Sequence, residues 1–376
     1  MDYPAERRSQ LVQGLSSEGV EALLVSNPVN VTYLTGFSGE SSYLVLGRER
    51  AVLLSDARFT QQLQEECLGL EVFIRPTGQT LHQATAEVLD KLGFRAVGFE
   101  RAHLTVAEWE LLRELAPAIS WKAIRDTVEK LRAIKDPSEI SQIREAIAIA
   151  ERAFRAFQAM LRPCESEKEL CDALEMYVRR FGGQCTSFPS IVAIGERSAL
   201  PHAPPTHRRV SEAELLLVDW GASGRFYKSD LTRILVTRKN SAFFEPVKQT
   251  TPGTKLESVY HVVLHAQEQA LRQLRPGLKG HDVDAEARRV IAEAGFGEFF
   301  GHGLGHGLGL QVHEAPALRP NSTAVLEAGM VVTVEPGIYL PGWGGVRIED
   351  DVLMTPDGCE VLTNLTKDLR LLVCDW

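Results

Sequence analysis

The sequence predicts two domains, a first one of α/β type and a larger second one in which helices and acid-bearing strands are combined. Its 376 residues exceed what one hydrophobic core usually organises. Helical and strand periods alternate in the first part, and a charged run at 129–135 leads from there into a long amphipathic helix. We therefore place the domains at 1–128 and 129–376.

The first domain is expected to mix short helices with buried strands. The segment 8–15 is amphipathic, and the apolar stretch 22–25 reads as a buried strand. The segments 41–46 and 51–54 are rich in apolar residues and read as two paired strands. This alternation is typical of an α/β domain.

Two helices open the second domain. Asp136 can cap a helix whose first turn contains Pro137, and apolar residues at helical spacing continue from there to Leu161. Ser166 and Glu169 have the spacing of a capping box, which predicts that a second helix begins there.

Further along, four strand-like segments each carry an acid where a core residue is expected. Burying an unpaired carboxylate costs roughly several kcal/mol, and few arginines stand near enough to neutralise four of them. A shared cation is therefore expected. The four acids are Asp219, Asp230, Glu335 and Glu349.

A glycine-rich run, 301–314, contains three of the ten histidines. We expect its glycines to permit a backbone that other residues would find strained, so that the imidazoles can converge. Read alone, the run could be a loop, and it matches neither Gly-x-Gly-x-x-Gly nor His-Glu-x-x-His. Together with the acids, one histidine completes an oxygen-rich set that suits a pair of hard divalent ions.

At this point the sequence resembles a known family. In order and local context, five residues are similar to the dinuclear-metal ligands of the pita-bread metallopeptidases, which include prolidase, aminopeptidase P and methionine aminopeptidase. Segments 26–37 and 56–58 resemble the creatinase-type N-terminal domain of prolidase and aminopeptidase P. The resemblance implies a creatinase-like α/β domain followed by an α+β pita-bread catalytic domain. The five residues are Asp219, Asp230, His306, Glu335 and Glu349.

The resemblance also implies a chemistry. Asp230 and Glu349 would bridge two divalent ions, Asp219 would bind one of them, and His306 the other. The ions would generate the attacking hydroxide. Manganese is favoured by the oxygen-rich set, with cobalt or zinc as alternatives.

Further residues receive roles from the same resemblance. Glu335 would both ligate a metal and carry the proton to the leaving amine. His202 and His313 would hydrogen-bond the substrate carbonyl oxygen. His302 would line the substrate pocket, while Arg347 would orient Glu349 or meet a substrate carboxylate.

Strand periodicity refines the set of acids. Side chains alternate between faces, so Glu349 shares a face with Arg347 and Asp351, and Asp350 points away from it with a structural role. The same spacing puts Thr333 beside Glu335, where its hydroxyl could support that ligand.

The resemblance implies cleavage of a peptide bond that precedes proline and assembly as a homodimer. The sequence leaves open whether the substrates are Xaa-Pro dipeptides or longer proline-containing peptides. Two other classes compete with this one: creatinase-like C–N hydrolysis without metal, and a non-catalytic binding module on the same fold.

Composition excludes other functions. A net charge of -9 argues against a nucleic-acid surface, and the sequence has no apolar run of about 20 residues that could cross a membrane. The first eight residues lack an apolar signal region, so a cytoplasmic location is expected. Six scattered cysteines are expected to be free thiols. The segment 240–253 is longer than the usual link to the next helix and is expected to be a surface excursion, rather than a lid or subunit contact.

Overall fold

The structure is a computed structural model that describes residues 3–237 and 255–374, in two compact units that divide after Arg132. The boundary after residue 128 stays a prediction. The expected surface excursion at 240–253 lies outside the described residues. No helix in the described ranges is both long and apolar enough to cross a membrane.

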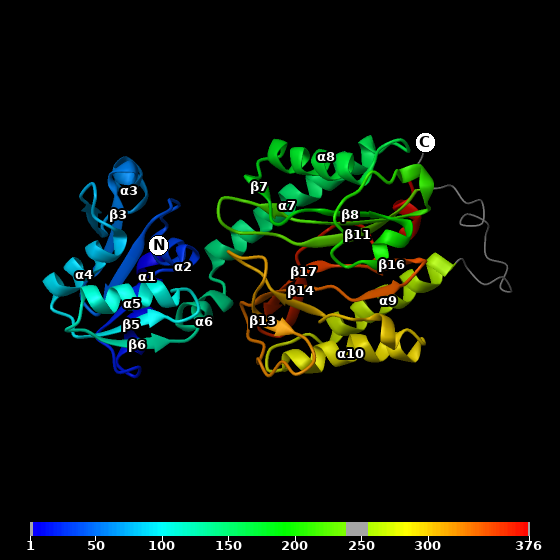
Figure 1. Ribbon diagram of the computed structural model, residues 1–376. Coiled ribbons are helices and arrows are strands. Elements are labelled where there is room, and N and C mark those ends of the chain that lie inside the picture. Colours follow the sequence, from blue (N-terminus) through cyan, green and yellow to red (C-terminus); the bar gives the residue numbers. More distant parts are fainter. Residues whose placement is uncertain (1–2, 238–254, 375–376) are drawn as a thin grey trace. The chain divides into compact units, whose positions relative to one another are not determined.

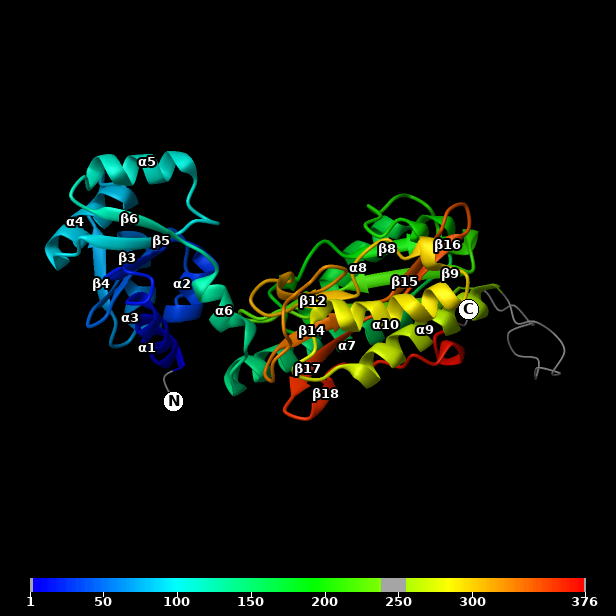
Figure 2. The same cartoon turned by 90° about the horizontal axis from the view of Figure 1, so that it is seen from below.

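The first unit is a six-stranded mixed sheet with helices on both faces (Figure 2). β1 pairs with β2 and β2 with β3 in antiparallel fashion, while the pairs β3–β4, β1–β5 and β5–β6 are parallel. The expected buried strand and the expected strand pair are thus confirmed. The strands are β1 (Ala22–Val25), β2 (Tyr43–Gly47), β3 (Ala51–Asp56), β4 (Glu71–Arg75), β5 (Ala96–Glu100) and β6 (Ser120–Ile124).

Helices cover this sheet because each buries one apolar face. α4 and α5 pack their apolar residues against those of β1, β2, β3 and β5. α1, α2 and α3 lie on the other side of the sheet (Figure 2). The helices are α1 (Tyr3–Leu15), α2 (Pro28–Thr35), α3 (Thr60–Glu66), α4 (Leu81–Leu92) and α5 (Val106–Leu115), and α6 (Thr127–Ala133) ends the unit.

Four long helices frame the second unit. α7 (Pro137–Met160) begins with the expected cap, in which Asp136 accepts from the backbone of Ser138 and Glu139, and Glu139 completes a capping box. α8 (Glu167–Arg180) begins after Ser166, whose side chain accepts from the backbone of Glu169, as expected. α9 (Lys255–Gln273) and α10 (Gly280–Glu293) follow later in the chain.

Two main sheets lie between these helices. The first has the order β11-β9-β8, and the second has the order β13-β12-β14-β17-β18. Two short pairs, β15–β16 and β7–β10, complete the strands. The strands are β7 (Cys185–Thr186), β8 (Ile191–Ile194), β9 (Leu215–Trp220), β10 (Ala222–Ser223), β11 (Leu231–Val236), β12 (Gly305–Gly307), β13 (Glu314–Leu318), β14 (Val331–Val334), β15 (Gly337–Leu340), β16 (Gly344–Arg347), β17 (Asp350–Thr355) and β18 (Gly358–Val361).

The helix pairs cover opposite sides of these strands (Figure 1). Apolar residues of α7 and α8 form one core with one face of β8, β9 and β11. Apolar residues of α9 and α10 form the other core, which takes in the opposite face of those strands and one face of β14 and β17. The two main sheets are thereby held between two helical layers.

Strand alternation decides where the acids of the first sheet point. In β9, Leu216, Val218 and Trp220 enter the core with α7 and α8, whereas Leu215 and Leu217 enter the core with α9 and α10. Asp219 points to the same face of β9 as Leu215 and Leu217, so its carboxylate is directed toward the second main sheet.

Candidate metal centre

The four acids lie at strand ends that the fold brings together. Asp219 is near the end of β9, and Asp230 directly precedes β11, with which β9 is paired. Glu335 directly follows β14, and Glu349 lies between β16 and β17. The backbone N–H of Glu349 donates to Thr232 O at 3.2 Å, which joins the segment before β17 to β11. Acids far apart in sequence therefore meet where the two sheets touch.

His306 joins the same cluster from β12. Its Nε2 lies 3.2 Å from Glu335 Oε1 and 3.8 Å from Asp230 Oδ2. Its Nδ1 lies 3.2 Å from the carbonyl oxygen of Gly307. A carbonyl only accepts, so we assign a hydrogen to Nδ1, and Nε2 is the nitrogen that is directed at the acids. Ligand atoms of Asp230, His306 and Glu349 all lie within 4.8 Å of one another.

Burial and mutual repulsion disturb the titration of these acids. Asp230 is 5% exposed and Glu349 is 2% exposed. Burial, and then the neighbouring carboxylates, raise the pKa of both groups well above its ordinary value. Burial also raises the pKa of Glu335, but His306, His302 and Arg347 together outweigh burial and bring the pKa below its ordinary value. Asp230 and Glu349 therefore have too little positive charge around them to offset their burial.

The residues present fit divalent metal ions. Oδ1 of Asp219 is buried and has no hydrogen-bond partner in the part of the chain that the structure describes. A cation among the acids would pair with that oxygen and offset the repulsion that raises the pKa of Asp230 and Glu349. Carboxylate oxygens with one imidazole nitrogen form a donor set suited to hard divalent ions.

Hydroxyl groups support several of these acids. Thr333 donates to Glu335 Oε1 at 3.2 Å and accepts from the backbone of His306 at 3.1 Å, in the position that strand spacing predicts. Thr232 donates to Glu349 Oε2 at 2.6 Å. We did not anticipate Thr232, although strand alternation places it two residues after Asp230 on the same face.

One arginine, Arg347, lies in the cluster, which agrees with the expectation that few arginines stand near enough to neutralise four acids. Arg347 is 3% exposed and its guanidinium donates to Asp219, to Thr232 and to the hydroxyl of Tyr339. These contacts occupy the guanidinium within the chain, and the expectation that Arg347 would meet a substrate carboxylate stays a prediction. Its link to Glu349 is also indirect, because Thr232 stands between them.

His302 is held by the same network. Its Nε2 lies 2.8 Å from the Tyr339 hydroxyl and its Nδ1 lies 2.7 Å from the carbonyl oxygen of Gly303. Burial lowers the pKa of His302, so the neutral ring carries its hydrogen on Nδ1 and accepts from Tyr339. Tyr339 was missed because only the pairing of β15 with β16, and no sequence spacing, places it beside Arg347.

A second buried ion pair fixes the backbone behind Glu349. Arg233 donates to Glu349 O at 2.7 Å and to Asp350 Oδ1 at 2.6 Å. Asp350 also accepts from Lys367 at 2.7 Å, and these cations lower its pKa although burial raises it. The expected structural role of Asp350 agrees with these contacts.

The glycines act differently from what we expected. Gly301, Gly303, Gly305, Gly307 and Gly309 all have negative or extended φ. Instead, a Cβ on Gly305 would lie 2.0 Å from Thr333 O, and one on Gly307 would lie 2.2 Å from Ala315 O. These glycines allow β12 to approach its neighbours closely, which brings His306 to the acids.

His313 and His202 lie at the edge of the cluster. The His313 and His306 rings are 4.3 Å apart between centroids, at 74°. Burial and then the charge of His306 lower the pKa of His313. His202 is exposed, and its charge lowers the pKa of Asp219, although burial raises the pKa of Asp219 overall. Both histidines can thus present an N–H near the acids.

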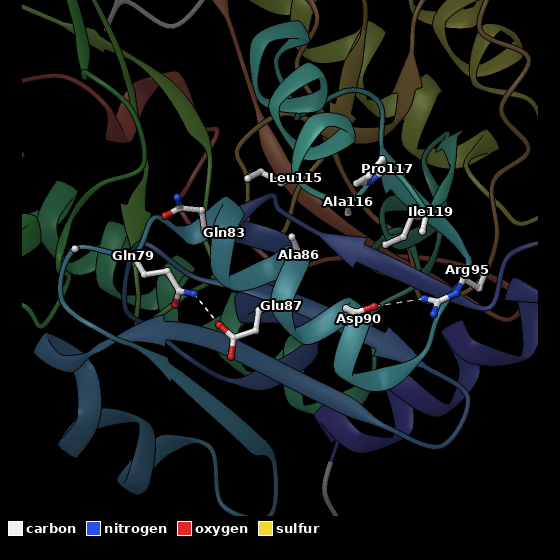
Figure 3. Close-up of a pocket in the computed structure, with 12 residues that line it drawn as sticks. Gln79, Gln83, Ala86, Glu87, Asp90, Arg95, Leu115, Ala116, Pro117 and Ile119 are labelled. Atoms are coloured by element: carbon white, nitrogen blue, oxygen red, sulfur yellow. Dashed lines mark hydrogen bonds and ion pairs between the residues drawn. The ribbon is translucent and has the colours of Figure 1, made fainter.

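A separate cavity of about 700 Å³ lies in the first unit (Figure 3). Its polar side chains pair locally: Gln79 donates to Glu87 at 2.7 Å, and Arg95 lies 3.8 Å from Asp90 with both side chains exposed. Leu115 and other apolar residues form the opposite wall. Since its acids do not converge on one point, we assign no chemistry to this cavity.

A metal-dependent hydrolase is the class of protein that this fold and this ligand set define. Comparison with known sequences identifies the particular family: the chain belongs to metallopeptidase family M24, whose model matches residues 141–356. Residues 7–134 match the creatinase/prolidase N-terminal domain. The expected family and the expected fold of both domains are confirmed, and membership implies divalent metal ions.

Similar proteins extend over nearly the whole chain. The uncharacterized peptidase YqhT of Bacillus subtilis (strain 168) is 37% identical over 354 residues, which covers 94% of this chain and 96% of that protein. The structure of an Xaa-Pro dipeptidase from Bacillus anthracis is 36% identical with a TM-score of 0.89, covering 98% of this chain and 99% of that one. An X-Pro aminopeptidase from Thermotoga maritima MSB8 is 34% identical with a TM-score of 0.86, covering 96% and 99%.

Proposed function

We propose that this metallopeptidase hydrolyses the peptide bond before proline, in Xaa-Pro dipeptides or at the N-terminus of longer peptides. The observation that carries the proposal is the cluster in which ligand atoms of Asp230, His306 and Glu349 lie within 4.8 Å of one another. Glu335 lies 3.2 Å from His306, and the buried Asp219 interacts electrostatically with Glu335. Relatives named Xaa-Pro dipeptidase and X-Pro aminopeptidase support the specificity.

In this proposal all five residues bind a pair of divalent ions. The ions supply Lewis acidity that makes water a nucleophile near neutral pH. Manganese is the proposed metal, because carboxylate oxygens dominate the donor set, with cobalt or zinc as alternatives. The chain is further proposed to act as a cytoplasmic homodimer, as its resemblance and composition lead us to expect.

Glu335 is proposed to move the proton. Its lowered pKa keeps the carboxylate ionised at neutral pH, so it can accept a proton from water and pass it to the leaving amine. His306 faces the same carboxylate at 3.2 Å and holds its direction.

His202 and His313 are proposed to donate to the carbonyl oxygen as it gains charge. A neutral imidazole can donate from one nitrogen, and the lowered pKa of His313 favours that neutral form. Removing one such donor commonly costs about 3 kcal/mol of transition-state stabilisation. His302 and Arg347 are proposed to shape the pocket wall through Tyr339, and Arg347 also neutralises Asp219.

Two peptides decide between the specificities. Protein stripped with a chelator and then loaded with Mn²⁺ is given Ala-Pro and Ala-Pro-Ala, with Ala-Ala and Ala-Ala-Ala as matched controls. We expect release of alanine only from the proline peptides, and only after metal is added. Cleavage of Ala-Pro alone means a dipeptidase, and release of alanine from Ala-Pro-Ala means an aminopeptidase.

Other outcomes would count against the proposal. Activity that survives the chelator would contradict metal-dependent hydrolysis and favour creatinase-like chemistry. Absence of activity with every divalent metal would favour a non-catalytic binding module.

A further inference from the structure

The carboxylate of Glu167 is fully buried at the start of α8, away from the metal centre, and the proposed reaction does not use it. Its side chain is 0% exposed. A buried carboxylate needs hydrogen-bond or ionic partners that offset the cost of its desolvation. The segments that supply those partners are the ones that the carboxylate holds in place. Glu167 is not needed as a helix cap, because Ser166 and Glu169 already form the capping box of α8.

Within the part of the chain that the structure describes, the partners of this carboxylate lie in one segment, 194–206, which starts at the last residue of β8 and is called the loop below. Oε1 accepts from the backbone N–H of Ile194 at 2.9 Å, at the beginning of the loop. Oε2 accepts from the backbone N–H of Thr206 at 2.8 Å and from its hydroxyl at 2.6 Å, at the end of the loop. Nε of Arg197 donates to both oxygens, at 3.0 and 2.9 Å. One carboxylate thus joins the two ends of the loop.

Other contacts leave the middle of the loop little freedom. Arg197 also donates to the carbonyl oxygen of Pro204 at 2.5 Å. Ser198 accepts from the backbone N–H of Gly345 at 2.7 Å, on β16, the strand that carries Arg347. His202 lies between these points, exposed, next to the buried Ala203. The loop is therefore tied both to α8 and to a strand of the metal centre.

We propose that Glu167 is a positioning residue for catalysis: by joining Ile194, Arg197 and Thr206, it sets the direction in which His202 meets the substrate carbonyl. This inference rests on the proposed role of His202. A donor to a developing oxyanion acts only when it is held at hydrogen-bond distance from that atom, so a loop free to move would lose the contact. Glu167 touches neither the acids of the metal centre nor His202 itself.

Glu167→Gln is the main test. It keeps the shape of the side chain but replaces one acceptor oxygen by an NH2 group, which cannot accept and would face the N–H of either Ile194 or Thr206. We expect kcat on the proline peptide to fall by roughly 10- to 100-fold, the range for residues that orient a catalytic group, with unchanged affinity for Mn²⁺. The matched control is Glu169→Gln, which changes the same turn of α8 without touching the loop.

A double-mutant cycle separates positioning from general destabilisation. His202→Ala should slow the reaction by itself, and Glu167→Gln should cause no further loss in that background. Glu169→Gln should have the same small effect in both backgrounds. Thr206→Val provides a milder variant that removes only the hydroxyl donor, and we expect a smaller loss of kcat that also vanishes without His202.

Hydrogen exchange gives a readout that does not depend on activity. In Glu167→Gln the amides of 194–206 should exchange faster than in the wild type, whereas in Glu169→Gln they should not. Unchanged exchange in Glu167→Gln, or a loss of kcat that persists without His202, would overturn the positioning role and leave the proposed function intact. If the metal-loaded wild type cleaves neither peptide, the proposed function fails, and the role of Glu167 in catalysis fails with it.

Discussion

Asp230→Asn is expected to reduce the rate of Xaa-Pro hydrolysis at least about a thousandfold. Loss of a shared metal ligand removes roughly several kcal/mol of transition-state stabilisation, and each 1.36 kcal/mol changes the rate about tenfold. The amide removes one of the three groups whose ligand atoms lie within 4.8 Å of one another. Steady-state rates on Ala-Pro and Ala-Pro-Ala at saturating Mn²⁺ measure the effect.

The same substitution is expected to have the opposite effect on the stability of the metal-free protein. When Asp230 ionises, Asp219, Glu335 and Glu349 repel its carboxylate, so removal of this group should raise the melting temperature in chelator at any pH where Asp230 would be ionised. The control is Asp282→Asn, since Asp282 caps α10 through Lys279 N and lies outside the cluster. A variant that keeps its activity, or that melts lower than the wild type in chelator, would contradict the assignment of Asp230.

The stability of the metal-free protein is expected to fall as pH rises. Asp230 and Glu349 have a folded-state pKa well above the values of about 3.9 and 4.3 that Asp and Glu have in unfolded chains. Between the unfolded and the folded pKa the native protein binds more protons, so the free energy of unfolding decreases with pH in that window. Added metal should reverse the trend, because protons compete with it for the same oxygens.

Thermal unfolding between about pH 5 and pH 8, with chelator or with Mn²⁺, measures both trends. Other groups titrate as well, so the informative quantity is the difference between the wild type and Asp230→Asn at each pH. That difference should grow as pH rises in chelator. Parallel curves for the two proteins would mean that Asp230 does not titrate in this range.

Much of the site was predictable from the sequence, for a physical reason. An acid at the end of an apolar strand is costly to bury, so the strand patterns around Asp219 and Asp230 are enough to indicate a cation. Strand alternation then correctly assigns Thr333 to Glu335 and separates Asp350 from Glu349. These inferences depend only on neighbours along one strand.

The contacts that could not be predicted are those between strands distant in the sequence. Arg347 reaches Asp219 because β16 lies near β9, and Tyr339 reaches Arg347 through a hairpin register that spacing does not specify. The close approach at Gly305 also depends on a neighbouring strand, which cannot be identified from the sequence. Backbone strain was therefore the expected reason for that glycine. The contacts of Glu167 with the loop 194–206 could not be predicted either, because an acid in the first turn of a helix is already common for its interaction with the helix dipole.

Anomalous diffraction from crystals of the Mn²⁺-loaded protein, recorded near the manganese absorption edge, tests the central claim most directly. We expect two adjacent peaks per chain among the carboxylates of Asp219, Asp230, Glu335 and Glu349, with Nε2 of His306 as a ligand to one of them. Peaks confined to the surface of the protein, or the absence of any peak at these residues, would contradict the metal centre described above.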